Sequence, residues 1–251
     1  TIVLRRDPVI NRTTFDNAGL ASDRVYGVYA AGSAVYAATR NGLSISTDGG
    51  NTFGHRTTAN GLGSNVVLGV HVSGSTVYAV TEGGLSVSTD GGSTFTNLDV
   101  FNEFTSTEVN AVFIASGAVY AATDNGLSIS TDGGSTFTRR MAGNVVNGVY
   151  ASGGTVYAAT GNGLGISTDG GSTFARRSTA NGLGSNAVNS VYVTGDSVYA
   201  ATGNGLSISI DGGRTFTNRL FSIGLDDDDN DVNDVYVFGS TVYAATGAGL
   251  F

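Results

Sequence analysis

The chain has 251 residues, including 39 glycines, one proline and no cysteine, and its 20 acidic residues outnumber its 12 basic residues to give a net charge of −8. The lack of cysteine excludes a disulfide scaffold, and the negative charge opposes binding to nucleic acid or to an anionic membrane surface. No run approaches the roughly 18 apolar residues of a membrane span. We therefore expect neither a nucleic-acid partner nor insertion into a membrane.

The first complete set of elements follows residue 24. Residues 25–30 and 34–39 are rich in β-branched and aromatic residues, residues 43–46 alternate apolar with polar side chains, and Phe53 starts a fourth segment. Glycine and asparagine clusters separate these segments, as is typical of short strands joined by tight turns. No segment has helical periodicity, so the sequence predicts an all-β protein.

This four-strand pattern recurs along the chain. Its first valine is found at Val25, Val67, Val109, Val146, Val188 and Val232, in steps of 37 to 44 residues. The last repeat is cut short at Phe251, and residues 1–15 resemble its missing half. Complementary half-repeats argue against an open solenoid, which needs capping repeats at both ends.

A period of about 42 residues with four strands is typical of propeller blades. The sequence predicts one domain spanning residues 1–251, an all-β six-bladed β-propeller with four-stranded antiparallel blades. We expect a 2+2 closure, in which residues 1–15 complete the blade that begins near residue 232. Such pairing would remove free strand edges.

One phrase is written five times. Ser46-Thr47-Asp48-Gly49-Gly50-Asn51-Thr52-Phe53 recurs at residues 88–95, 130–137, 167–174 and 209–216. The phrase resembles the Asp-box, or BNR repeat, whose pattern is Ser/Thr-x-Asp-x-Gly-x-Thr-Trp/Phe. The resemblance covers residues 25–251 and implies a structural turn between the third and fourth strands of each blade.

The aspartates of the phrase are interpreted as structural. A carboxylate at this position can accept hydrogen bonds from backbone N–H groups across its own turn, while the glycines permit positive φ. The interpretation applies to Asp48, Asp90, Asp132, Asp169 and Asp211. The alternative, five acidic sites for a metal or sugar, would need carboxylates that these turns do not occupy.

Two series of aromatic residues are interpreted as core between the blades, in preference to a ligand platform. One lies in the second strand: Tyr36, Tyr78, Tyr120, Tyr157, Tyr199 and Tyr243. The other lies in the first strand: Tyr29, His71, Phe113, Tyr150, Tyr192 and Tyr236. His71 replaces an aromatic residue in the second of these series, so we expect a packed residue and not a catalyst.

Candidate binding residues lie in the connections between blades, because binding residues favour variable loops. Residues 58–65 and 179–186 share the sequence Thr-Ala-Asn-Gly-Leu-Gly-Ser-Asn. Their asparagines could bind sugar hydroxyls at repeated weak sites that gain by multivalency. The candidates are Asn60, Asn65, Asn181 and Asn186. The alternative is that these loops are only permissive turns.

An acidic run at residues 226–231 is a candidate Ca²⁺ site, because hard cations take several oxygen ligands. Its candidate ligands are Asp226, Asp228 and Asp231. The spacing does not match an EF-hand, and a solvated acidic loop is the alternative. No other cofactor is expected.

Members of the Asp-box family include sialidases, xyloglucan-cleaving enzymes, sortilin-type receptors, photosystem assembly factors and lectin-like propellers, and fold alone does not choose among them. We predict a non-catalytic scaffold, with lectin-like carbohydrate binding as its sharpest form and a protein partner as an alternative ligand. A purely structural propeller used in an assembly, or one that was recently amplified or engineered, is second, and a sialidase-like glycosidase is third. An extracellular setting is favoured.

Overall fold

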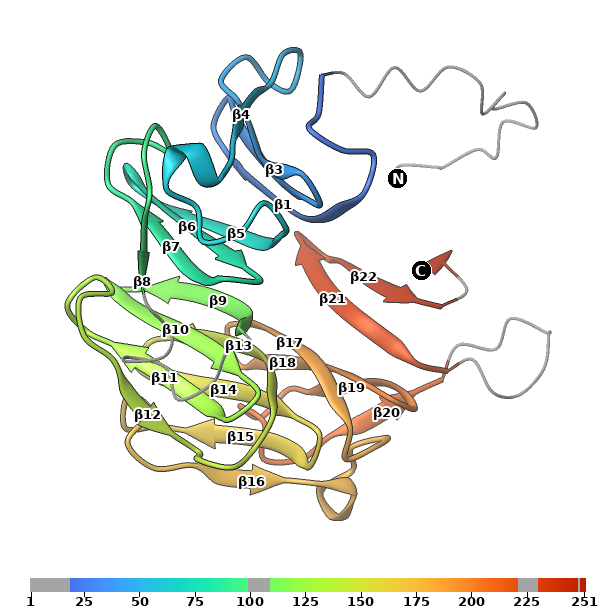
Figure 1. Cartoon of the computed structure of the whole chain (residues 1–251). Helices are drawn as coiled ribbons and strands as arrows, with labels where there is room; N and C mark the ends of the chain where they lie inside the picture. The colour runs from blue at the N-terminus through green and yellow to red at the C-terminus, as the bar shows by residue number, and fades with distance from the viewer. Residues whose placement is uncertain (1–18, 99–108, 221–229, 248) are drawn as a thin grey trace, which may run out of the picture.

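The computed structural model describes residues 19–98, 109–220, 230–247 and 249–251. Within these residues the fold is all-β, with two single-turn 3₁₀ helices, η1 (Thr58–Asn60) and η2 (Thr179–Asn181). Six antiparallel sheets follow one another around a common axis as the blades of a β-propeller (Figure 1). The six-bladed, all-β architecture predicted from the repeat is confirmed. No helix in the described part of the chain has the length and apolar character needed to cross a membrane.

Each blade presents its strands in chain order, as an up-and-down meander. The first strands are β1 (Val25–Ala31), β5 (Val67–Ser73), β9 (Val109–Ala115), β13 (Val146–Ser152), β17 (Val188–Thr194) and β21 (Val232–Phe238). The second strands are β2 (Ala34–Thr39), β6 (Thr76–Thr81), β10 (Ala118–Thr123), β14 (Thr155–Thr160), β18 (Ser197–Thr202) and β22 (Thr241–Thr246). First strands of successive blades contact one another, which places them nearest the axis.

The outer half of each blade is shorter. The third strands are β3 (Gly42–Ser46), β7 (Gly84–Ser88), β11 (Gly126–Ser130), β15 (Gly163–Ser167), β19 (Gly205–Ser209) and β23 (Gly249–Leu250). The fourth strands are β4 (Gly54–Arg56), β8 (Thr96–Leu98), β12 (Thr138–Arg140), β16 (Ala175–Arg177) and β20 (Thr217–Arg219). Five sheets therefore have four described strands, and the sixth has three.

A β-bulge interrupts the start of every first strand. In blade 4, for example, Val146 pairs with Thr160 and Gly148 with Ala159, so Asn147 is left without a cross-strand partner. A bulge re-aims the extra side chain, and here the Asn147 Nδ2 atom donates to the carbonyl oxygen of Val188 in the next blade at 2.8 Å. The residue that leaves the pairing of one sheet thus forms a hydrogen bond to the next blade.

The hydrophobic core lies between blades. At the first seam, Tyr36 and Ile45 of blade 1 belong to the same buried cluster as Val67 and Val77 of blade 2. The third strand lies inside this packing, and its leucine is fully buried in four blades: Leu43, Leu85, Leu127 and Leu164. Burying one leucine side chain contributes about 1.5–3 kcal/mol. The repeated Gly-Leu-Ser-Ile-Ser segment is therefore buried on both faces of the sheet, with its leucine and isoleucine on one face and its serines on the other.

The described strands of the sixth blade show what the C-terminal part contributes to the expected closure. Strands β21 and β22 are followed by β23, which pairs with β22 through Ala245 and Leu250. The backbone N–H groups of Ala244 and Phe251 each donate to the other residue's carbonyl oxygen, at 2.8 and 2.9 Å. The C-terminal part thus supplies two strands and the start of a third. The predicted closing segment, residues 1–15, lies outside the described residues.

Candidate functional site

Each repeated phrase forms the turn between the third and fourth strands of its blade, here called the aspartate turn. In blade 1, the Asp48 Oδ1 atom accepts from the Thr52 N–H group at 2.9 Å, and Oδ2 accepts from the Thr52 hydroxyl at 2.6 Å. The Ser46 hydroxyl donates to Oδ1 at 2.7 Å and accepts from the Gly50 N–H group at 2.8 Å. Both carboxylate oxygens are therefore used within the turn.

The other four aspartate turns repeat these bonds. Their carboxylates belong to Asp90, Asp132, Asp169 and Asp211. Hydrogen bonds from Thr52 and Ser46 hold the pKa of Asp48 well below its usual range. In the other turns the serine makes the largest contribution to the same lowering of the pKa. A carboxylate ionised so far below neutral pH is poorly suited to general acid–base catalysis.

The two identical loops form the same structure. In the first, the Asn60 Oδ1 atom accepts from the Thr57 N–H group at 3.0 Å, and the Asn65 Oδ1 atom accepts from the Thr58 N–H group at 2.9 Å. In the second, Asn181 and Asn186 accept from Ser178 and Thr179 at 3.1 and 3.0 Å. The four candidate asparagines therefore use their carbonyl oxygens to shape their own loops.

Each of these loops also docks on the next blade. The Gly63 N–H group donates to the Ser86 hydroxyl at 3.0 Å, and that hydroxyl donates to the Asn97 Oδ1 atom at 3.0 Å. The Asn97 amide in turn donates to the Gly83 carbonyl oxygen at 2.9 Å. Ser207 and Asn218 hold Gly184 of the second loop in the same way. We call this serine–asparagine pair the loop latch.

The first-strand aromatic residues form a continuous arc near the axis. Neighbouring ring centroids lie 4.5 to 5.4 Å apart, from Tyr29 through His71, Phe113, Tyr150 and Tyr192 to Tyr236. His71 is half-buried between Tyr29 and Phe113, and burial lowers its pKa to about 4. His71 is therefore neutral at physiological pH and packs as an aromatic ring.

The candidate Ca²⁺ site falls largely on residues that are not described. Asp226 and Asp228 lie outside the described residues, whereas Asp231 is described and exposed. Nearby, the Asp234 Oδ1 atom accepts from the Ser190 hydroxyl at 2.6 Å. In the described ranges, no three His, Asp or Glu side chains gather in a group that would hold a metal ion.

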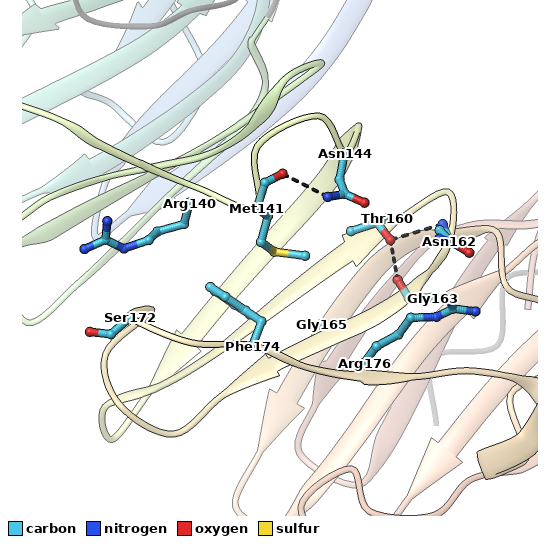
Figure 2. Close-up of a pocket in the computed structure, with 10 residues that line it drawn as sticks. All are labelled: Arg140, Met141, Asn144, Thr160, Asn162, Gly163, Gly165, Ser172, Phe174 and Arg176. Carbon is cyan, nitrogen blue, oxygen red and sulfur yellow. Dashed lines mark hydrogen bonds between the residues drawn. The ribbon is translucent and has the colours of Figure 1, made fainter.

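A cavity of about 350 Å³ opens along the seam between blades 3 and 4 (Figure 2). Met141 and Phe174 face each other across its middle, and Arg140 and Arg176 extend on opposite sides of this apolar pair. Arg140 is the last residue of β12, and Arg176 lies in β16. The signal that sequence reasoning missed is Gly165, which lines the cavity and replaces a serine found at the same position of β3, β7, β11 and β19.

The fold and its inter-blade packing define the chain as a β-propeller. No protein-family model matches the sequence, and a search of curated protein sequences finds no significant match. Solved structures, in contrast, match over most of the chain at low sequence identity.

Three of these structures illustrate the match. The extracellular domain assigned to the hybrid two-component system BT3049 of B. thetaiotaomicron has a TM-score of 0.75 at 18% identity, over 92% of this chain and 33% of that one. YCF48 bound to D1 peptide has a TM-score of 0.65 at 13% identity, over 92% and 79%. The computationally designed protein Ika8 has a TM-score of 0.63 at 8% identity, over 90% and 69%.

The chain thus spans about a third of the length of the extracellular domain that it resembles. At such identities the likeness establishes the fold alone. These neighbours include extracellular domains assigned to one-component and hybrid two-component systems of B. thetaiotaomicron, and YCF48 bound to D1 peptide.

Proposed function

We propose that this chain is a non-catalytic binding scaffold built from Asp-box blades. The observation that carries the proposal is the use of the repeated carboxylates: each accepts hydrogen bonds from its own turn through both oxygens. A glycosidase needs an asymmetric pair of carboxylates about 5–10 Å apart in a cleft. Because the repeated aspartates hold the fold together, the most abundant acidic groups are not free for such chemistry.

The sharpest form of the proposal is weak, multivalent carbohydrate binding at the two identical loops. The Nδ2 atoms of Asn65 and Asn186 make no hydrogen bond to any described residue, although their Oδ1 atoms are occupied. Each loop can therefore offer an amide donor to a sugar hydroxyl. Two such sites on one rigid ring would raise the avidity for a branched or repeating glycan.

A purely structural propeller is the second candidate. The loop latches support it, because they give residues 58–65 and 179–186 a stabilising role that needs no ligand. The resemblance to the designed protein Ika8 is compatible with an amplified or engineered origin. A protein partner stays a further alternative, since YCF48 is described as bound to a peptide.

A glycan array of the purified protein, run with Ca²⁺ and again with a chelator, tests the proposal. We expect a saturable signal that falls in the double variant Asn65→Ala/Asn186→Ala and persists in Asn51→Ala, whose side chain lies on an aspartate turn. Loss of the signal in chelator would bring Asp226, Asp228 and Asp231 into the site. A blank array from folded protein would contradict carbohydrate binding and favour the structural role.

A further inference from the structure

We propose that the seam between blades 3 and 4 is a binding site for a small organic anion, a carboxylate carried on an apolar or aromatic body. This site does not include residues 58–65 or 179–186, the two loops proposed to bind carbohydrate, and it takes a different class of ligand. The inference therefore goes beyond the function proposed above. It rests on three changes in the repeat that occur together at this seam.

The first change removes the loop that fills the equivalent space elsewhere. At the seams after blades 1 and 4, a ten-residue connection carries a buried leucine, Leu62 or Leu183, each 4% exposed. After blade 3 the connection shortens to residues 141–145, between β12 and β13. It makes a tight turn in which the Asn144 N–H group and Nδ2 atom both donate to the Met141 carbonyl oxygen, at 3.1 and 3.0 Å. The space along the seam is therefore left partly open.

The second change removes the loop latch. Ser86 pairs with Asn97 in β7 and β8, and this pair receives the incoming loop. At the matching register of blade 4, Gly165 pairs with Arg176. A Cβ atom built on Gly165 would lie 2.9 Å from the Met141 Cε atom and 3.3 Å from the Phe174 Cδ1 atom. The Met141 side chain therefore occupies the place that a serine takes in the other blades, and Gly165 lets it pack beside Phe174 in the lining of the cavity.

The third change releases an arginine. Arg56 and Arg177, the last residues of β4 and β16, each donate through Nε to a glycine carbonyl oxygen of the next blade, at 2.6 and 2.9 Å. Arg140 occupies the same register at the end of β12, but among the described residues it makes no such bond and instead lines the cavity. Its guanidinium group is therefore available to a ligand.

The lining of the cavity selects the chemistry of that ligand. Met141 and Phe174 offer a flexible thioether and an aromatic ring as an apolar middle (Figure 2). Arg140 and Arg176 extend on opposite sides of this pair (Figure 2), and the planar guanidinium group of either one can bind a carboxylate through two hydrogen bonds. Asn144 and Asn162 add amide groups at the rim. A cavity of about 350 Å³ is in the size range of small-molecule sites.

Charge points the same way. The chain carries a net charge of −8, yet two of its twelve arginines, Arg140 and Arg176, line this cavity. Among the described residues, no carboxylate side chain lines the cavity. An apolar anion therefore meets local positive charge on a protein whose overall charge is negative.

The test is calorimetric titration of the folded protein with 2-naphthoate and with 2-naphthamide, its uncharged counterpart. We expect saturable binding of the carboxylate and binding of the amide weaker by about tenfold or more, since a charged hydrogen bond contributes about that much. No saturable binding of 2-naphthoate at millimolar concentration, or equal binding of the amide, would overturn the proposal.

Variants locate the binding. Gly165→Ser restores the residue of the other blades, so we expect it to fold normally, to push the flexible end of Met141 into the cavity and to weaken binding about tenfold. Arg140→Gln/Arg176→Gln should weaken binding at least as much. Arg214→Gln removes one positive charge from an aspartate turn away from the cavity, and should bind as the wild type does. Unchanged binding in both seam variants would show that the anion binds elsewhere and would overturn the assignment.

Discussion

The guanidinium Nε atom of Arg56 donates a hydrogen bond to the carbonyl oxygen of Gly92 across the seam between blades 1 and 2, at 2.6 Å. Arg177 and Gly213 make the same bond between blades 4 and 5, at 2.9 Å. Each bond ties the outermost strand of one blade to the aspartate turn of the next. The outer rim of the propeller is therefore held by charged donors as well as by apolar packing.

The first prediction concerns this bond. Arg56→Met keeps the apolar stem but removes the donor, so we expect the free energy of unfolding to fall by about 1–2 kcal/mol. Arg140→Met is the matched control, because Arg140 makes no bond of this kind to any residue that the structure describes, and it should cost less than about 0.5 kcal/mol. Urea unfolding followed by circular dichroism measures both. Equal losses in the two variants would contradict the role given to the bond.

The second prediction separates the two glycines of an aspartate turn. Both have positive φ, +73° at Gly91 and +89° at Gly92, but a Cβ atom on Gly91 would meet nothing within 4 Å, whereas one on Gly92 would lie 2.6 Å from the Ile45 Cδ1 atom. Gly91→Ala should cost about 1–2 kcal/mol of backbone strain. Gly92→Ala should cost about 2–4 kcal/mol, because it also overpacks the seam.

A double variant identifies the cause of that extra cost. Ile45→Val removes the Cδ1 atom that the new methyl group would meet, so Gly92→Ala should be less damaging in the Ile45→Val background than in the wild type. Thermal unfolding of the four proteins in this cycle measures the coupling. If the effects of Gly92→Ala and Ile45→Val are additive, the cost of Gly92→Ala comes from backbone strain alone.

The third prediction concerns His71 and acid. Its pKa is about 4 in the folded protein and 6.5 for a free histidine, so the unfolded chain binds more protons between these values. Stability is therefore full above about pH 6.5 and falls as the pH drops toward 4, by at most about 3 kcal/mol. His71→Phe, which copies blade 3, should remove this step while keeping the arc of rings. The free energy of unfolding of both proteins, measured from pH 7.5 to 4, checks this prediction. A parallel fall of that free energy in the wild type and the variant would contradict it.

The fourth prediction concerns the aspartate turns. Because hydrogen bonds depress the pKa of Asp132, its ionised form stabilises the folded state, and this contribution is lost as the pH falls below about 4, the pKa of a free carboxyl. Asp132→Asn should therefore lower the melting temperature at pH 7. The difference between the variant and the wild type should shrink as the pH is lowered from 4 toward 2. A constant difference over that range would exclude the charge as the cause.

Much of the fold follows from the sequence, because the repeat carries it. Each first strand begins at the valine that marks its repeat, from Val25 to Val232. The tyrosines of the second strand are buried in the first four blades, as expected for a core between blades. Because the blades repeat, the strands predicted for one blade can be checked against those predicted for the others. The closure, in contrast, depends on residues 1–15, which lie outside the described residues.

The candidate sites were harder to predict, since the type of a residue does not say which groups its side chain will contact in the folded protein. Asn60 and Asn65 look like free polar groups in a loop, but their carbonyl oxygens are used to form that loop. Gly165 looks like one more glycine among 39, although it replaces a serine of the other repeats, and the register then sets it opposite Arg176. Where a repeat protein departs from its own pattern is thus a better signal for a site than what it repeats.

The ligand site that we propose lies at the seam between blades 3 and 4, where the repeat is broken. The most direct measurement is a two-dimensional amide NMR titration of the isotopically labelled protein with 2-naphthoate. We expect saturable shifts concentrated at Met141, Asn144, Gly165 and Phe174, and none at the matching positions of blades 2 and 5. Shifts spread evenly over all blades, or no shifts at all from a folded protein, would contradict the proposed site.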